Sequence, residues 1–111
     1  MKFFRELKKG STKLLILSIL KDKPMYGYQI AKEIKNLSKN YFDLADGTIY
    51  PALHDLEKES YVKSKWEKYK GRERKYYYIT EKGMEFFQKA SEEWNIFVKA
   101  LSIFLHRKQE V

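Results

Sequence analysis

The sequence predicts a mainly α-helical domain of the α+β class, in which three helices are followed by one small β-hairpin and one long last helix. Three observations lead to this order. Between residues 11 and 60 the apolar residues recur every three or four positions, as in helices with one buried face. Between residues 61 and 80, β-branched and aromatic residues flank a polar stretch that contains Gly71, as in a hairpin. From residue 81 the helical spacing returns and continues to about residue 105.

The composition indicates a single folded domain. A chain of 111 residues can bury a core of ordinary size, and an aromatic content of 16% is too high for a disordered chain. The absence of cysteine excludes disulfide frameworks and thiolate metal sites. The longest apolar run, residues 14–20, contains Ser18 and is far shorter than the roughly 20 residues of a membrane span. The first ten residues lack the features of a signal peptide, so we expect a soluble cytoplasmic protein without a membrane partner.

Two helical segments are expected before residue 21. Residues 2–9 form a short amphipathic segment with Phe3 and Phe4 on its apolar side, and Gly10 ends it. A helix then starts at the serine or threonine that follows, whose hydroxyl can cap free amides, and runs to residue 20. Because residues 14–20 are apolar nearly all round the helix, this segment should be enclosed on several sides.

The next helix is predicted from Met25 to about Leu37, with Pro24 placed to open it. Its apolar residues recur at spacings of four, four and three, namely Tyr26, Ile30, Ile34 and Leu37. Gly27 lies between two tyrosines, which suggests that another part of the chain approaches the backbone closely there.

The third helix is predicted over residues 46–60. At 100° per residue its apolar side chains share one face, namely Ile49, Ala52, Leu53 and Leu56, and the opposite face holds Gly47, Pro51, His54 and Lys58. Asp46 is the preferred N-cap and Thr48 the second choice, and Pro51 falls near the end of the first turn. Residues 41–60 carry five acidic side chains and one basic one, but the acids of the helix fall on its flanks. The outward face could therefore enter a DNA groove although the segment is acidic.

The predicted hairpin is strongly basic. Residues 61–80 carry seven basic and two acidic side chains, as do residues 1–23 at the N-terminus. Concentrated cations favour contact with a phosphate backbone over a merely solvated hairpin. The hairpin tip contains Lys68, Lys70, Arg72 and Arg74. Since side chains alternate across a strand, at least one of Tyr76, Tyr77 and Tyr78 should belong to the core.

The last helix should be capped by Thr80 and should pack lengthwise against another helix. Its seam has spacings of three and four and consists of Phe87, Ala90, Trp94, Phe97, Leu101 and Phe104. A second apolar line contains Phe86, Val98 and Leu105. One line can face the chain's own core, and a second copy of the chain is the simplest cover for the other. We expect a homodimer, and we assign Phe3 and Phe4 to the same interface as the seam.

This order of elements is a winged helix-turn-helix with a C-terminal dimerisation helix. In that architecture the third helix enters the major groove and the hairpin, or wing, lies along the backbone or minor groove. We assign residues 1–80 to the DNA-binding unit with its N-terminal arm and residues 81–111 to the dimerisation helix. The sequence has no phosphate-cradling glycine loop, no nucleophile with a histidine base and no paired carboxylates, so no enzymatic activity is expected. His54 and His106 lie on different elements, and we expect no metal or other cofactor.

Three motifs stand out, P-M-Y-G-Y-Q-I at residues 24–30, D-G-T-I-Y-P-A-L-H-D-L-E-K-E-S-Y-V at 46–62 and G-R-E-R-K-Y-Y-Y-I-T-E-K-G at 71–83. Together with E-E-W at 92–94 they resemble the PadR family of transcriptional regulators, specifically its short subfamily with a single C-terminal helix. The resemblance extends over residues 11–105. Ser60 stands where the family usually has glycine, so the bend between the third helix and the wing is expected to be built differently.

The resemblance implies a dimeric regulator, generally a repressor, that binds double-stranded DNA at a pseudo-palindromic operator. It carries the recognition-helix contacts onto Thr48, Tyr50 and His54 and the wing contacts onto Lys70, Arg72 and Lys75. Three further cations at the outward helix face and the hairpin tip complete the expected DNA-binding set, namely Lys58, Lys68 and Arg74. A winged-helix module that binds RNA or another protein is the alternative.

The resemblance also implies that a small molecule releases some members from DNA. Trp94 matches an interface tryptophan that stacks on planar aromatic ligands in drug-responsive members, and Phe97 lies one helical turn further on. The effector would then be a planar aromatic or phenolic compound. The alternative is that Trp94 only packs in the dimer interface, as a large side chain in a seam commonly does.

Overall fold

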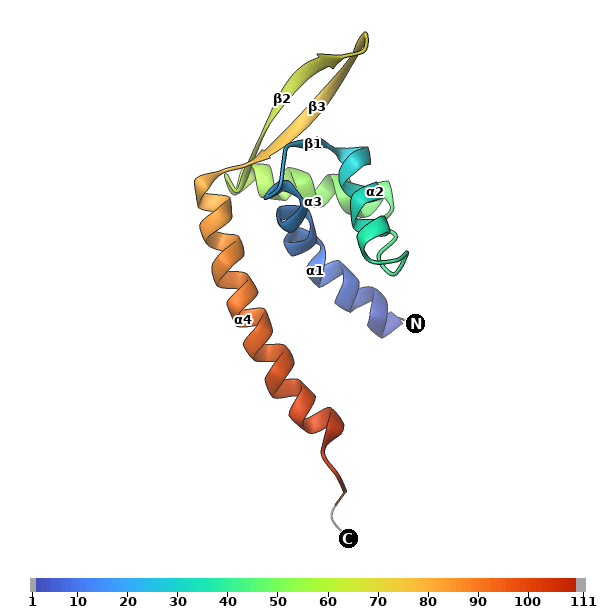
Figure 1. The fold of residues 1–111 in the computed structure, drawn as a ribbon, viewed down its shortest axis with the longest axis vertical. Coiled ribbons are helices and arrows are strands. Elements are labelled where there is room, and N and C mark those ends of the chain that lie inside the picture. The colour runs from blue at the N-terminus through green and yellow to red at the C-terminus, as the bar shows by residue number, and fades with distance from the viewer. Residues whose placement is uncertain (1, 110–111) are drawn as a thin grey trace.

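The computed structural model describes residues 2–109, apart from the side chains of Phe4, Lys8 and Lys9. A compact group of helices carries a projecting hairpin at one end, and a long last helix runs away from the hairpin on the other side (Figure 1). The elements are α1 (Lys2–Leu20), β1 (Met25–Tyr26), α2 (Gly27–Leu37), α3 (Asp46–Lys58), β2 (Val62–Tyr69), β3 (Arg72–Ile79) and α4 (Glu81–His106). The predicted winged helix-turn-helix with a long C-terminal helix is confirmed.

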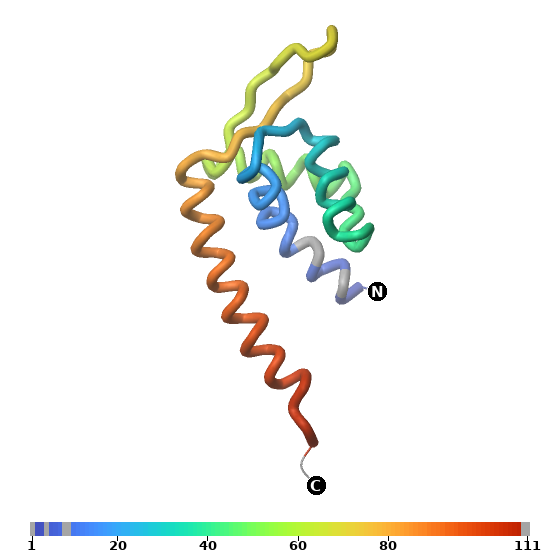
Figure 2. The backbone as a smooth tube through the Cα atoms, viewed as in Figure 1, coloured from blue at the N-terminus to red at the C-terminus, as the bar shows by residue number. Residues whose placement is uncertain are grey.

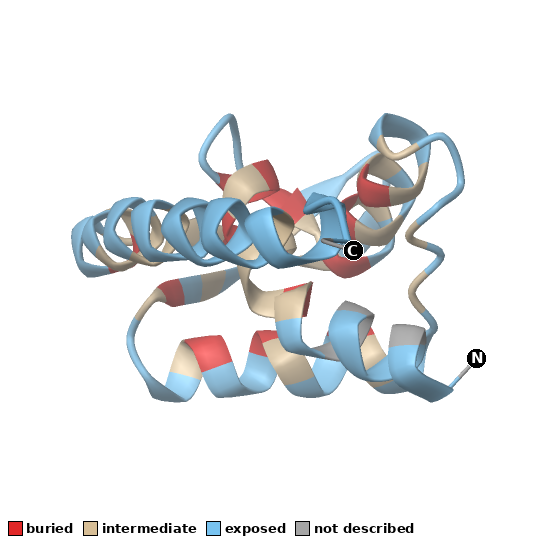
Figure 3. Cartoon of the chain, turned by 90° about the horizontal axis from the view of Figure 1, so that it is seen from below, coloured by how far each residue is buried: buried red, intermediate tan, exposed pale blue. Residues whose placement is uncertain are grey.

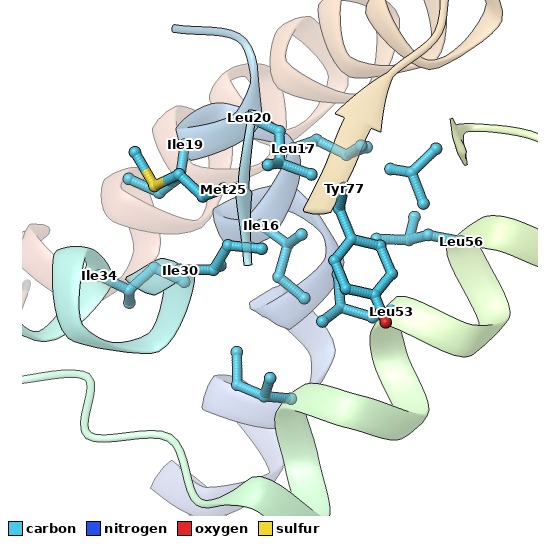
Figure 4. Close-up of a cluster of buried hydrophobic side chains, with 12 residues drawn as sticks. Ile16, Leu17, Ile19, Leu20, Met25, Ile30, Ile34, Leu53, Leu56 and Tyr77 are labelled. Carbon is cyan, nitrogen blue, oxygen red and sulfur yellow. The ribbon is translucent and has the colours of Figure 1, made fainter. Parts of the chain in front are cut away.

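A single apolar core lies where α1, α2 and α3 meet the base of the sheet. Twelve buried side chains form it, and Ile16 and Leu17 of α1 have no exposed surface (Figure 4). Ile30 and Ile34 reach this core from α2, and Leu53 does so from α3. The expectation that the apolar part of α1 is enclosed on several sides is confirmed.

The first helix is continuous, which corrects the predicted break at Gly10. α1 runs from Lys2 to Leu20 and passes through the glycine without interruption (Figure 2). The Ser11 hydroxyl donates to the Leu7 carbonyl at 3.2 Å, one turn back, and does not cap a new helix. A glycine inside a helix costs only about 1 kcal/mol, and the strong helix formers on both sides outweigh that cost.

Met25 and Tyr26 form a short strand, which corrects the predicted start of the second helix. They pair antiparallel with Tyr77 and Tyr76 of β3, so the sheet has the order β1-β3-β2. The pairing also buries Met25 in the core, where burial of its side chain stabilises the extended conformation. α2 therefore begins at Gly27, and Pro24 lies before the strand.

α3 has the predicted extent within two residues, but its N-terminus is capped differently. Ala45 is the N-cap, and its carbonyl accepts from the amides of Thr48 at 2.9 Å and Ile49 at 3.0 Å. Asp46 is the first helical residue, with no side-chain cap hydrogen bond at this end, and Pro51 lies in the second turn. The negative charge of Asp46 still suits the positive end of the helix dipole.

The hairpin has the predicted form. Its register pairs Tyr69 with Arg72, which leaves Lys70 and Gly71 as a two-residue turn. Both turn residues have positive φ, 50° and 78°, as the favoured turns of two-residue hairpins require. Tyr77 is the tyrosine that enters the core, at 6% exposure.

α4 begins at the predicted cap and leaves the body after three turns. The Thr80 hydroxyl oxygen accepts from the Gly83 amide at 3.0 Å. Phe86 and Phe87 pack against the core, but between residues 92 and 109 every residue except Ser102 is exposed (Figure 3). In the part of the chain that the structure describes, no helix combines the length and the apolar character that crossing a bilayer requires.

Candidate nucleic-acid interface

The strip of α3 directly opposite the core carries no acidic side chain, and the exposed Asp55 lies at its edge, in the hollow that Thr48 and Pro51 also line. Ile49, Leu53 and Leu56 are buried on the inner side, with exposures of 1% or less. Pro51, His54 and Lys58 are exposed on the opposite side, as the helical spacing predicts. Thr48 is partly buried on the flank toward α1, and Tyr50 is 46% exposed on the flank toward α2 and the wing.

Two flanking acids of α3 are engaged by neighbouring elements. On one side Glu59 forms an ion pair of 2.8 Å with Lys13 of α1. On the other side Glu57 accepts a hydrogen bond from the Ser64 hydroxyl of β2 and lies 3.7 Å from the ammonium of Lys75 on β3. The acidity of this segment is thus partly neutralised within the protein, away from the face that a polyanion would meet.

Tyr50 is held by a close approach to the start of α2. A Cβ atom added at Gly27 would lie 2.7 Å from Tyr50 Cε1, closer than real side chains approach each other. The predicted close backbone approach at Gly27 is therefore present, and its partner is the α3 tyrosine. The Tyr50 ring therefore lies against the backbone at the start of α2, on the flank of the outward face.

The basic side chains of the wing fall into two groups. Lys68, Lys70 and Arg72 at the tip are exposed. Arg74 lies with its guanidinium 4.2 Å from the centroid of the Tyr26 ring, and Lys75 lies over Tyr77 at 5.6 Å in addition to its pairing with Glu57. The first group extends into solvent, and the second lies against the body near α3.

A groove of about 690 Å³ lies between α3, the start of α2 and the wing, and we call it the wing groove. It brings together Tyr50, Arg72, Arg74 and Lys75 of the predicted set. Thr48 lies on the other side of α3, in a hollow shared with α1, and the remaining predicted residues do not line the wing groove. Two aromatic residues of the groove, Tyr28 and Trp66, were not predicted from the sequence. The signal for Trp66 is the alternation of side chains along the strands. Ser64 pairs with the buried Tyr77, and Trp66, two residues further on, lies on the same α3 side of the hairpin.

The titrating groups of this region give no sign of acid–base chemistry. Burial, followed by the charge of Glu57, raises the pKa of the Tyr77 phenol, and the hydrogen bond to Glu67 raises the pKa of Tyr78. Both phenols therefore stay protonated at neutral pH. Within residues 2–109, no cluster of three or more histidines and carboxylates could hold a metal ion.

A second cavity, of about 440 Å³, lies between α1 and α4. Leu14 and Leu15 line it from α1, and Phe87 and Trp94 line it from α4. The Trp94 ring lies 5.8 Å from that of Phe97, which does not itself line the cavity. The other residues assigned to the dimer interface lie outside this cavity; Phe3, Leu101 and Phe104 are exposed, Ala90 is partly buried, and the side chain of Phe4 is outside the described part of the structure.

The sequence matches the profile of the transcriptional regulator PadR-like family over residues 16–89. The transcriptional regulator Rv3488 of Mycobacterium tuberculosis is 32% identical over 79 residues, which is 71% of each chain. A PadR family transcription regulator from Clostridium difficile R20291 has a similar structure, with a TM-score of 0.75, 36% identity, and coverage of 86% of this chain and 98% of that one. A PadR family regulator from Eggerthella lenta superimposes with a TM-score of 0.83 at 26% identity, over 96% of this chain and 92% of the other.

These matches extend across the helix-turn-helix and the wing, the same elements that carry the acid-free strip of α3 and the basic hairpin. The family is one of transcriptional regulators and not of enzymes, and membership implies DNA binding. The expected resemblance is confirmed: the chain belongs to the PadR-like family of transcriptional regulators.

Proposed function

We propose that the protein is a cytoplasmic, homodimeric repressor that binds double-stranded DNA sequence-specifically and leaves it when a small planar molecule binds. One observation carries the DNA-binding part of this proposal. Glu57 of α3 and Glu59 at its C-cap are turned to the flanks of the helix and engaged there, so that the outward face of the helix meets DNA beside a basic wing.

The proposed DNA contacts are of two kinds: contacts that read the base sequence and contacts that anchor the protein on the phosphates. Thr48, Tyr50 and His54 lie on or beside the outward face of α3 and meet base edges in the major groove, where sequence can be read. The anchoring cations meet phosphates and set the position of the helix, and they are Lys58, Lys68, Lys70, Arg72, Arg74 and Lys75. Affinity then comes chiefly from the wing and selectivity chiefly from α3.

The outer half of α4 supplies the dimer contact. Its seam residues Phe97, Leu101 and Phe104 are 54%, 44% and 68% exposed in the single chain. A second copy covers this apolar surface, with Phe3 of α1 beside it; Phe4, assigned to the same interface, has its side chain outside the described part of the structure. A twofold dimer places the two α3 helices in successive major grooves, so the operator is a pseudo-palindrome with half-sites about 34 Å apart.

The cavity between α1 and α4 is the proposed effector site. Trp94 offers an indole face on its wall, and apolar side chains of α1 lie opposite. A planar aromatic or phenolic compound stacked on Trp94, with Phe97 against the far side of the indole, would alter the packing of α4 and thereby the spacing of the two α3 helices.

Selection of bound duplexes from random DNA, with and without candidate planar compounds, tests the proposal. We expect enrichment of one pseudo-palindromic sequence and loss of binding with an effective compound. Arg72→Ala should weaken binding to every duplex, whereas His54→Ala should also change which sequence is enriched. Binding of all duplexes with equal affinity, or preference for RNA, would rule out a sequence-specific regulator and favour the RNA-binding alternative.

A further inference from the structure

Trp66 is a large aromatic residue that the protein leaves in water. It lies in the middle of β2 and is 68% exposed, although burial of an indole normally makes a large contribution to stability. In the register of the hairpin Trp66 is opposite Lys75, and Ser64 is opposite the buried Tyr77. Since alternate residues share a face, Trp66 lies on the hairpin face that turns toward α3.

The surroundings of Trp66 have the composition of a site for an anionic chain with apolar parts. Three cations line the wing groove together with the indole: Lys75 lies on the same hairpin face as Trp66, and Arg72 and Arg74 reach the groove from the alternate positions of β3. The carboxylates nearby are those of Glu73 in the lining and Glu57 beside Lys75. Tyr50 lies in the same groove, so an apolar surface extends from the wing to the flank of α3. Nucleic-acid strands combine phosphates with apolar sugars and base faces, and this groove is complementary to both.

The body of the protein positions two cations of the groove, and Lys75 is partly neutralised by an ion pair. Arg74 is held with its guanidinium 4.2 Å from the Tyr26 ring, an aromatic contact that leaves its N–H donors available. Lys75 is 3.7 Å from Glu57 with a side-chain exposure of 37%, which is a loose, half-solvated pair. A phosphate can therefore approach both side chains at little cost.

We propose that one strand of the operator duplex runs through the wing groove and that the Trp66 indole packs against a sugar and the adjoining base edge of that strand. This inference rests on the proposed DNA-binding function and adds to it a contact made by apolar packing. Trp66 then restricts where the wing sits on the duplex, in addition to the charge contacts of the tip.

The protein can report this contact directly, because it has only two tryptophans, Trp66 and Trp94. Both can be labelled with 5-fluorotryptophan in the otherwise unchanged protein, and Trp66→Phe assigns the two fluorine signals. On addition of the selected duplex, the Trp66 signal should shift and broaden. The Trp94 signal, from α4 and outside the wing groove, should move less and serves as the internal reference.

Affinity measurements provide the second test. Trp66→Ala should weaken duplex binding about ten-fold, and Trp66→Phe, which keeps an aromatic face, should stay within about three-fold of the original. Leu37→Ala is the control. Leu37 is as exposed as Trp66, at 68%, but lies at the end of α2 and lines no part of the wing groove, so its loss should leave affinity nearly unchanged.

The outcomes separate this inference from the proposed function. If the duplex binds but the Trp66 signal stays in place and Trp66→Ala binds normally, the inference fails and the regulator proposal stands. If single-stranded DNA of the same sequence perturbs Trp66 more strongly than the duplex, the groove serves single strands and the inference is overturned. If no duplex binds at all, the proposed function fails with it.

Discussion

Ser60 adopts a backbone conformation that favours glycine. It follows the C-cap of α3, is exposed, and has φ of 65°. A residue with a side chain pays about 1–2 kcal/mol for the left-handed conformation relative to the usual one. The bend between α3 and the wing thus places a residue other than glycine in the left-handed conformation, at a cost in backbone strain.

Ser60→Gly should therefore stabilise the protein. We expect the free energy of unfolding to rise by up to about 1 kcal/mol, since the relief of strain exceeds the added entropy of glycine in the unfolded chain. Urea unfolding at fixed protein concentration measures the change. Ser60→Ala is the control, because alanine keeps a Cβ and should give no gain; an equal gain from both substitutions would mean that the serine hydroxyl, and not the backbone, is the source of the cost.

At the scale of elements, the decisive junction is the one at which the wing ends and α4 begins. Gly83 in the first turn of α4 lies directly against the end of the bend, where a Cβ atom would be 2.1 Å from the Tyr61 carbonyl oxygen and 2.9 Å from Ile79 Cγ1. Lys82 adds a hydrogen bond of 3.0 Å to the Glu59 carbonyl. The C-terminus of α3, the base of the wing and the root of α4 therefore meet at one point.

Gly83→Ala should destabilise the protein by about 3 kcal/mol, because the backbone carbonyl that it meets cannot swing aside as a side chain would. Thermal unfolding followed by circular dichroism measures this effect. The same substitution at Gly10, which has nothing within 4 Å of an added Cβ and lies inside a helix, should instead stabilise by about 0.5–1 kcal/mol. Equal loss of stability in both variants would show that the contact of Gly83 with the Tyr61 carbonyl is not what distinguishes the two sites.

Elements defined by local pattern could be predicted from the sequence, and those defined by a distant partner could not. The hairpin around Gly71 and the Thr80 cap follow from neighbours in the chain, and both are present. β1 forms because Met25 pairs with Tyr77, fifty-two residues further along the chain. The spacing of apolar residues in this segment predicts a helix throughout and contains no sign of that distant partner. The predicted helix end at Gly10 is wrong for a related reason. A glycine ends a helix only where the flanking residues do not favour continuing it.

The candidate site likewise has features that could be predicted from the sequence and features that could not. The acid-free strip of α3 could be predicted because it depends only on residue spacing within one helix. The wing groove depends on how the hairpin folds over α3, and Trp66 joins Tyr50 there only through that tertiary arrangement. The pairing of Lys75 with Glu57 likewise could not be predicted, because the charge pattern of the sequence does not show which cation of the wing has an acidic partner.

At the scale of the whole molecule, the exposed end of α4 leads to a prediction about assembly. Leu101→Asp places a charge in the apolar seam and should convert a dimer into a folded monomer of 13.4 kDa, because a buried carboxylate without a partner is strongly disfavoured. Sedimentation equilibrium measures the mass. Binding to a full pseudo-palindrome should fall steeply in the same variant, while weak binding to a half-site remains.

Lys99→Asp is the control for the assembly prediction. It introduces the same side chain two residues away, on the opposite side of α4, where the helix meets water. We expect this variant to remain dimeric. Dissociation of both variants would indicate a general effect of acidic charge on the helix, and persistence of the dimer in Leu101→Asp would remove the seam from the interface.

In the proposed dimer, the junction at Gly83 would make α4 a lever arm for DNA recognition. α4 has 26 residues and a length of about 39 Å, and its root is locked to the end of α3 and the base of the wing. In the proposed dimer, Trp94 lies about 20 Å along α4 from its root, so a change of about 5° in the crossing angle there moves the root by about 2 Å, about half the rise of one base pair. An effector that changes the packing at Trp94 would thereby bring the two recognition helices out of step with the grooves of the operator.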